Sequence, residues 1–182
     1  MTWIVLLVVV VVVALAAILM YNALIRSRNQ VDNAWSQIDV QLKRRIDLIP
    51  NLVETVKGYA AHERETLDAV ISARQRAMAA GDPHAQAAAD SAMTGALRHL
   101  FALSESYPDL KANQNFLALQ EELSATEGRV AYARQFYNDS VLSYNNRLQA
   151  FPTVFFARML RFDERDYFEA DESARDVPTI EF

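Results

Sequence analysis

The chain has 182 residues, enough for one folded domain behind an N-terminal segment, and a formal net charge of −5. Hydrophobic residues make up 52%, but 4 glycines and 5 prolines are too few for the many tight turns of a sheet protein. The acidic balance argues against nucleic-acid binding, and the absence of cysteine excludes disulfides and thiolate chemistry. Composition therefore favours an all-α protein.

The first predicted element is a membrane-spanning helix. Residues 3–20, WIVLLVVVVVVALAAILM, contain no charged side chain. At about 1.5 Å per residue they extend roughly 27 Å, close to the thickness of a bilayer's hydrocarbon core. Trp3 and Tyr21 flank the run, as amphipathic rings do at the two membrane interfaces. We expect residues 1–28 to form a transmembrane anchor and juxtamembrane link, with Trp3, Met20 and Tyr21 at its boundaries.

A cleaved signal peptide is the alternative interpretation of this run. Ala14-Leu15-Ala16 resembles a small-x-small cleavage site, but no basic region precedes Trp3 as in a secretory signal, which favours retention. The positive-inside rule places the following residues in the cytoplasm. We therefore expect a single-pass protein of the cell (inner) membrane with its N-terminus outside. The basic residues that support this orientation are Arg26, Arg28, Lys43, Arg44 and Arg45.

A long first soluble helix is predicted after Asn29, continuing from the anchor without an intervening proline or glycine. Pro50 lies inside it and removes one backbone hydrogen bond, so we expect either a kink near Ile46 or a break. The apolar stripe that predicts the helix consists of Trp35, Ile38, Leu42, Ile46, Ile49, Val53, Val56, Ala60, Leu67, Ile71 and Met78.

The second helix is predicted to be short and alanine-rich. Gly81 ends the preceding helix, Asp82 is a good N-cap and Pro83 suits a first helical position. We expect this helix to end near Ser104, before a turn at residues 106–109.

The third helix has the most regular pattern in the chain. Its apolar residues recur every seven positions over about five heptads, which predicts left-handed packing against an antiparallel partner, the first soluble helix. The repeat consists of Phe116, Leu123, Val130, Tyr137, Tyr144 and Phe151.

After Pro152 the segment TVFFARMLRF predicts a short apolar helix, and residues 171–182 predict an acidic, flexible tail. The predicted fold is therefore all-α: an N-terminal transmembrane helix followed by a long antiparallel helical bundle over residues 29–170. The bundle is expected to contain three long helices plus a short C-terminal helix.

Two stretches of the chain resemble the signature regions of the LemA family of bacterial membrane proteins. The first is YNALIRSRNQVDNAWSQIDVQLKRRIDLIPNLVETVKGYAAHERETL, from Tyr21 to Leu67. The second is LQEELSATEGRVAYARQFYNDSVLSYNNRLQAFP, from Leu119 to Pro152. The resemblance implies a long antiparallel helical bundle projecting from the membrane, with no assigned enzymatic reaction.

No catalytic, cofactor or metal site is predicted. His62-Glu63 begins like the helical zinc motif H-E-x-x-H, but Thr66 stands where the second imidazole is needed. The sequence also has no Gly-rich phosphate loop, nucleophile elbow or convergent pair of acids. We therefore expect that the protein is not an enzyme.

Charged and aromatic residues supply the candidate interaction sites. Tyr137 belongs to the heptad core, whereas Arg134, Phe136 and Asn138 form a candidate partner interface, because aromatic and arginine side chains combine contact area with directional bonds. The basic trio at 43–45 is expected to form salt bridges within the chain, including with Asp32, Asp39 and Asp47, or with a partner; lipid head groups are the alternative.

Phe155 and Phe156 lie in a segment too apolar to be left in water. Docking across the end of the bundle is favoured, and insertion into the membrane interface or burial against a neighbouring copy are the alternatives.

We expect a non-catalytic, membrane-anchored helical scaffold or adaptor at the cytoplasmic membrane face, which binds partner proteins or assembles with itself. A sensor or enzyme with a site in the bundle core is the alternative, as is a membrane-remodelling protein. The expected partners are the lipid bilayer, further copies of the chain in a homo-oligomer, and unidentified membrane or cytoplasmic proteins. No nucleic acid and no cofactor is expected.

Overall fold

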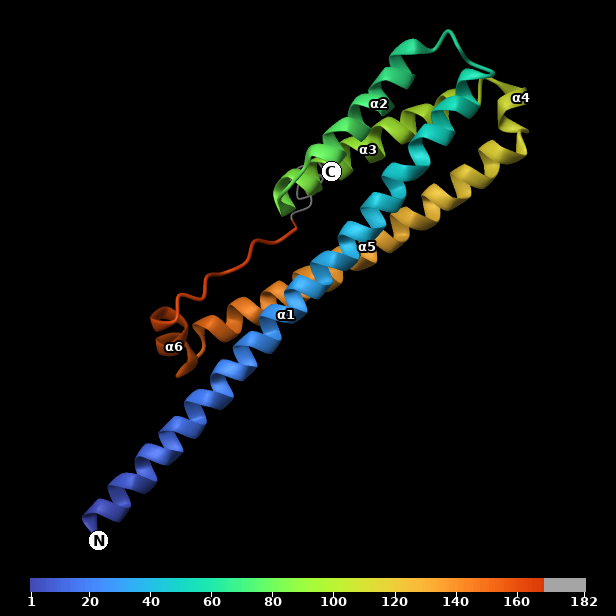
Figure 1. Ribbon diagram of the computed structural model, residues 1–182. Coiled ribbons are helices and arrows are strands. Elements are labelled where there is room, and N and C mark those ends of the chain that lie inside the picture. The colour runs from blue at the N-terminus through green and yellow to red at the C-terminus, as the bar shows by residue number, and fades with distance from the viewer. Residues whose placement is uncertain (169–182) are drawn as a thin grey trace, which may run out of the picture. The chain divides into compact units, whose positions relative to one another are not determined.

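The computed structural model describes residues 1–168, so the predicted acidic tail at 171–182 lies outside the described residues. Residues 1–168 form six helices and no strand (Figure 1). This confirms the predicted all-α fold with an apolar N-terminal helix. The helices are α1 (Thr2–Lys57), α2 (Arg64–Ala79), α3 (Pro83–Ser104), α4 (Pro108–Lys111), α5 (Gln114–Gln149) and α6 (Thr153–Met159).

The helices belong to two compact units, and α1 and α5 contribute to both. Unit 1 comprises Met1–Gln37 and Gln135–Asp166, and so contains the apolar start of α1, the end of α5, and α6. Unit 2 comprises Ile38–Arg134 together with Tyr167 and Phe168.

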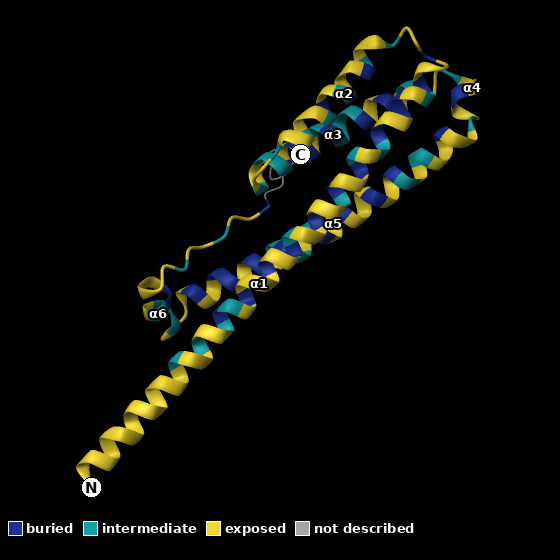
Figure 2. Ribbon diagram, viewed as in Figure 1, coloured by how far each residue is buried: buried dark blue, intermediate teal, exposed yellow. Residues whose placement is uncertain are grey.

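The start of α1 is an exposed apolar helix (Figure 2). None of its most apolar stretch is buried, and within residues 1–168 it is the one helix long and apolar enough to cross a membrane, judged by length and composition. This is consistent with a single-pass membrane protein. Residues 22–29 are helical throughout, as predicted, so the apolar start and the later turns of α1 form one continuous helix.

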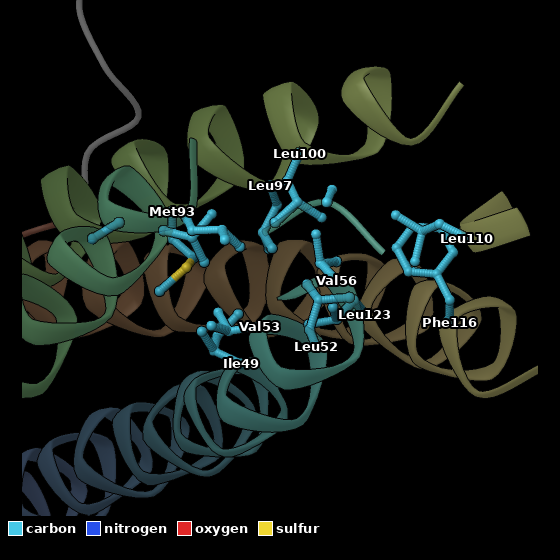
Figure 3. Packing of buried hydrophobic residues seen from close by; sticks show 14 residues of the cluster. Ile49, Leu52, Val53, Val56, Met93, Leu97, Leu100, Leu110, Phe116 and Leu123 are labelled. Atoms are coloured by element: carbon cyan, nitrogen blue, oxygen red, sulfur yellow. The ribbon is translucent and has the colours of Figure 1, made fainter. Parts of the chain in front are cut away.

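The core of unit 2 is an aliphatic cluster with contributions from five helices (Figure 3). Fully burying one such side chain stabilises a fold by about 1.5–3 kcal/mol, so this cluster is the main source of stability in unit 2. The figure labels Ile49, Leu52, Val53 and Val56 of α1, Met93, Leu97 and Leu100 of α3, Leu110 of α4, and Phe116 and Leu123 of α5.

Pro50 does not break α1. A proline has no N–H, so the carbonyl group of Ile46, four residues earlier, loses its partner within the helix. In the structure Nε of Arg74, from α2, donates a hydrogen bond to this carbonyl oxygen over 3.3 Å. A side chain from a neighbouring helix therefore replaces the missing bond, and α1 continues to Lys57.

The break in the predicted stripe comes instead at residues 58–63, between α1 and α2. Gly58 opens this turn, and glycine destabilises a helix by about 1 kcal/mol relative to alanine. Ala60 lies within the turn and is nevertheless buried in the core, so it keeps its place in the apolar pattern. For this reason the spacing of apolar residues did not reveal the break.

The other predicted boundaries agree well with the structure. The side chain of Asp82 caps α3 by accepting a hydrogen bond from the Ala85 N–H over 2.8 Å, and Pro83 begins the helix. The heptad positions from Phe116 to Tyr144 are buried along α5. Phe151 is 82% exposed, so its assignment to the stripe was wrong: α5 ends at Gln149, before that residue.

Replacing Arg74 tests the bond to the freed carbonyl. The change Arg74→Met should cost about 1 kcal/mol of unfolding free energy, because the Ile46 carbonyl then lacks a partner. In a Pro50→Ala background the loss should be less than half as large, since the introduced alanine supplies its own N–H. Thermal melting of the detergent-solubilised chain measures both. An equal loss in the two backgrounds would contradict this account, and Arg76→Met, at an exposed position of α2, is the control.

Candidate functional site

An exposed apolar patch lies around α6 in unit 1. It consists of Phe151, Phe155, Met159 and Leu160, and we refer to it as the α6 patch. The rings of Phe151 and Phe155 meet edge to face with 6.0 Å between their centroids. On the other side of the short helix Ala157 is buried. α6 therefore exposes Phe155 and Met159, while Ala157 faces inward.

The α6 patch lies near the end of the apolar run of α1. Phe162, just after the patch, packs edge to face against Tyr21, with 6.2 Å between ring centroids. Tyr21 directly follows the apolar residues 3–20. The same unit contains the exposed arginines Arg26, Arg147 and Arg158. Apolar, aromatic and cationic groups together suit the boundary between hydrocarbon and lipid head groups.

After α6 the chain continues as an extended segment, drawn in red in Figure 1. We call residues 163–166 the strap. Asn145 of α5 binds Arg165 of the strap reciprocally: its Nδ2 donates to the Arg165 carbonyl over 2.9 Å, and its Oδ1 accepts from the Arg165 N–H over 3.0 Å. The side-chain amide of Asn145 thus donates and accepts in the way that a peptide group of a neighbouring strand would.

Two buried tyrosines of α5 also bind the main chain of the strap. The hydroxyl of Tyr137 donates to the Asp166 carbonyl over 2.8 Å, and that of Tyr144 donates to the Asp163 carbonyl over 3.1 Å. An ion pair of 3.0 Å between Arg165 and Asp32 of α1 adds a side-chain contact. The strap is thus held mainly through its backbone.

Burial is the largest influence on both tyrosines and raises the pKa of each phenol, because it disfavours the charged form. The guanidinium of Arg165 opposes this effect by favouring the phenolate, but burial prevails at Tyr137 and at Tyr144.

The centre of unit 2 contains a buried ion pair between Arg45 of α1 and Asp90 of α3. Nη1 of Arg45 lies 2.6 Å from Oδ1 of Asp90, and the two side chains are only 3% and 6% exposed. Nη2 of Arg45 donates to Oγ1 of Thr94 over 3.1 Å, and Arg134 of α5 lies 3.8 Å from the same carboxylate. Three helices are joined through one aspartate.

A cavity of about 250 Å³ adjoins this pair within unit 2. Its wall combines apolar side chains, such as Ile46 and Met93, with the acids Asp39 and Asp47. Within the described chain the buried Nε of Arg45 has no hydrogen-bond partner, although the other guanidinium nitrogens do. No group of three or more metal-ligating side chains occurs among residues 1–168.

The predicted interaction residues have diverse surroundings. Arg44 and Arg45 do form salt bridges, but their partners come from other helices: Glu122 of α5 lies 2.6 Å from Arg44, and Asp90 binds Arg45. The predicted pairing with acids of the first helix is thus corrected for these two arginines, because positions 90 and 122 are brought close only by folding.

Arg134, Phe136 and Asn138 belong to different environments. Arg134 is close to Asp90 and also lies over the ring of Phe168, 4.8 Å from its centroid. Phe136 and Asn138 are partly buried in unit 1. An interface formed by the three remains a prediction. Sequence reasoning missed Asp90 and Asn145, since a lone acid in an alanine-rich helix and an asparagine between heptad positions have no motif around them.

The described residues form an all-α protein whose one long apolar helix is consistent with a single-pass membrane protein. Residues 34–182 match the LemA family, and the chain belongs to that family. It is 30% identical over 165 residues to protein LemA of Metamycoplasma hominis, which covers 88% of this chain and 74% of that protein. It is also 24% identical over 189 residues to magnetosome protein MamQ of Magnetospirillum gryphiswaldense, covering 90% and 69% of the two chains.

A third relative is magnetosome protein MamQ 2 of Paramagnetospirillum magneticum. The identity is 25% over 193 residues, which is 91% of this chain and 71% of that protein.

Removing Asp90 alone should be far more damaging than removing the whole ion pair. Asp90→Leu leaves the Arg45 charge buried without its main partner, and we expect a loss of about 3–5 kcal/mol in unfolding free energy. The double variant Arg45→Met, Asp90→Leu should recover most of that loss. Urea unfolding in detergent measures both. Arg44→Ala, which breaks a partly exposed pair, should cost under about 1 kcal/mol. Additive losses in the double variant would refute coupling of the pair.

Unit 1 should lose stability in alkali through its two buried tyrosines. Folding raises the pKa of both phenols above the usual value of about 10. The contribution of the two neutral phenols to the unfolding free energy is therefore complete below about pH 10, and it is lost as the pH rises through their pKa values in the folded protein. The variant Tyr137→Phe, Tyr144→Phe should show a smaller fall in unfolding free energy above about pH 10. Tyr132→Phe, at an exposed position of α5, is the control that keeps the fall.

Proposed function

We propose that this chain is a non-catalytic, membrane-anchored helical scaffold or adaptor that acts at the cytoplasmic face of the membrane. The observation that carries the proposal is the continuity of α1, whose exposed apolar start and buried later turns belong to one helix. A continuous helix is a semi-rigid connection, whereas a Gly-rich linker is flexible. Such a connection suits a protein that presents a surface at the membrane.

The cytoplasmic orientation is supported by the basic residues that follow the apolar run. Arg26 and Arg28 are exposed in the first turns after Tyr21. Folding adds Arg147 to the same region, since its Nη1 donates to the carbonyl of Ala23 over 3.5 Å. Positive charge retains a segment on the cytoplasmic side.

The α6 patch gives the scaffold a second contact with the bilayer. Phe155 is 65% exposed and lies on the outward face, whereas Phe156 is partly buried. We therefore assign Phe155 to the membrane interface and Phe156 to docking. Arg158 and Arg161 are exposed beside the patch and suit anionic lipid head groups.

The names of the relatives identify neither a reaction nor a partner. Two of them are called magnetosome proteins, and we take from this only that a protein similar to this one serves at a defined cellular structure. A membrane-remodelling role is the version of the proposal that depends most on the α6 patch.

A sensor or enzyme with its site in unit 2 is the second candidate. The cavity beside Arg45 favours it, as does the Nε of that residue, because a buried polar group without a protein partner can be satisfied by a bound molecule or ion. Metal analysis and ligand-dependent melting of the purified chain separate the candidates: a metal or metabolite that raises the melting temperature supports a site, and none does so for a pure scaffold.

The position of α6 can be tested with single cysteines, since the chain has none of its own. A polarity-sensitive dye on Phe155→Cys in proteoliposomes should emit at shorter wavelength and be quenched by brominated lipid chains, because the site lies in the interface. The same dye on Ser143→Cys, an exposed position of α5 in unit 1, is the control and should show neither effect.

Equal emission and quenching at the two sites would refute the membrane contact of α6. The Ser143→Cys chain also reports orientation: a membrane-impermeant thiol reagent should label it in inside-out vesicles and not in intact cells.

A further inference from the structure

We propose that the strap is exchanged between copies, so that α5 of one chain holds residues 163–166 of a second chain. The inference rests on the self-assembling form of the proposed function and assigns it a surface. The occupant is a second copy of this chain, because the structure already displays a segment that fits the surface.

The surface recognises an extended main chain. Tyr137, Tyr144 and Asn145 form one face of α5, at spacings of seven and eight residues, and their polar atoms bind three carbonyl groups and one N–H of the strap. Main-chain groups are identical in every copy. The ion pair of Arg165 with Asp32 adds a side-chain match that a second copy also provides.

An empty surface would be costly. Tyr137, Tyr144 and Asn145 are buried beneath the strap, and buried polar atoms that lose their partners destabilise a fold. A strap that leaves its own chain must therefore be replaced by another extended segment. The strap of a neighbour restores all four bonds without a change in the surface, which is the principle of exchange between protomers.

Arg161, between α6 and the strap, is the hinge. Its φ is 54°, in the left-handed region that non-glycine residues occupy at a cost. The N–H of Phe162 donates to the Ala157 carbonyl over 3.0 Å and so closes this turn at the end of α6. Extending the backbone at Arg161 relieves the strain and directs Phe162 and the strap away from their own α5.

The membrane raises the chance of exchange. Chains anchored through α1 share one surface, which increases the effective concentration of each strap near the α5 of its neighbours. Since the hinge lies beside α6, two exchanging copies meet at their α6 ends.

Crosslinking between two tagged chains tests the proposal directly. Gln149 and Glu164 are exposed and joined by a hydrogen bond of 2.7 Å between α5 and the strap. One full-length chain carries Gln149→Cys, the other carries Glu164→Cys, and both are reconstituted together in liposomes and oxidised. We expect a disulfide between the two tags at least about tenfold more abundant than in the control mixture of Ser143→Cys with Glu164→Cys. Position 143 lies about 240° around the helix from position 149.

The hinge supplies a pair of variants with opposite effects. Arg161→Gly removes the strain of the left-handed turn and should lower the yield of mixed disulfide about fivefold. Arg161→Pro fixes φ near −65°, prevents that turn and should raise the yield by a similar factor. Shifts of both variants in the same direction, or no shift, would overturn the role of Arg161.

Size measurement in detergent separates failure of this inference from failure of the proposed function. A dimer without the specific disulfide overturns strap exchange and leaves self-assembly through another surface. A monomer without the disulfide overturns exchange and self-assembly together, while membrane anchoring is judged independently by the dye at position 155. A dimer with the disulfide supports exchange.

Discussion

Main-chain N–H and C=O groups that leave water need hydrogen-bond partners, and this constraint shapes the described part of the chain. In the apolar start of α1 a continuous helix meets it, as a bilayer requires. At Pro50 the helix cannot, and Arg74 of α2 donates to the Ile46 carbonyl instead. After α6, where the chain is extended, Asn145 and two tyrosines of α5 bind the main-chain carbonyl groups of the strap. At these two places side chains supply the hydrogen bonds that regular secondary structure does not.

In unit 2 buried charged side chains also need partners. Burying Arg45 and Asp90 removes both from water, and the loss is offset only because three helices contribute to one network. An apolar pair of similar volume could stabilise the unit as well, so stability alone does not account for the ion pair. Because the pair needs a specific mutual geometry, it helps to determine which helix faces meet. A cavity adjoins the pair.

Unit 1 combines the features of a membrane-proximal element. The apolar run, the ring contact of Tyr21 with Phe162, and the exposed arginines occur in one compact unit. The strap belongs to that unit as well, so the proposed contacts with lipid and with a second copy are joined through α6. A scaffold whose assembly surface lies beside its membrane surface would form its assemblies where it is anchored. Family membership agrees with this architecture and leaves the partner open.

The sequence by itself determined the helical fold, the apolar run, the cap at Asp82 and the buried face of α5 up to Tyr144, because each depends on local periodicity or on a few neighbouring residues. Only the tertiary structure decided that Pro50 is tolerated, that Arg45 binds Asp90, and that Asn145 holds Arg165. These contacts join residues between 20 and 45 positions apart. Their partners are single polar side chains, whose pairing depends on distances that arise only when the helices pack.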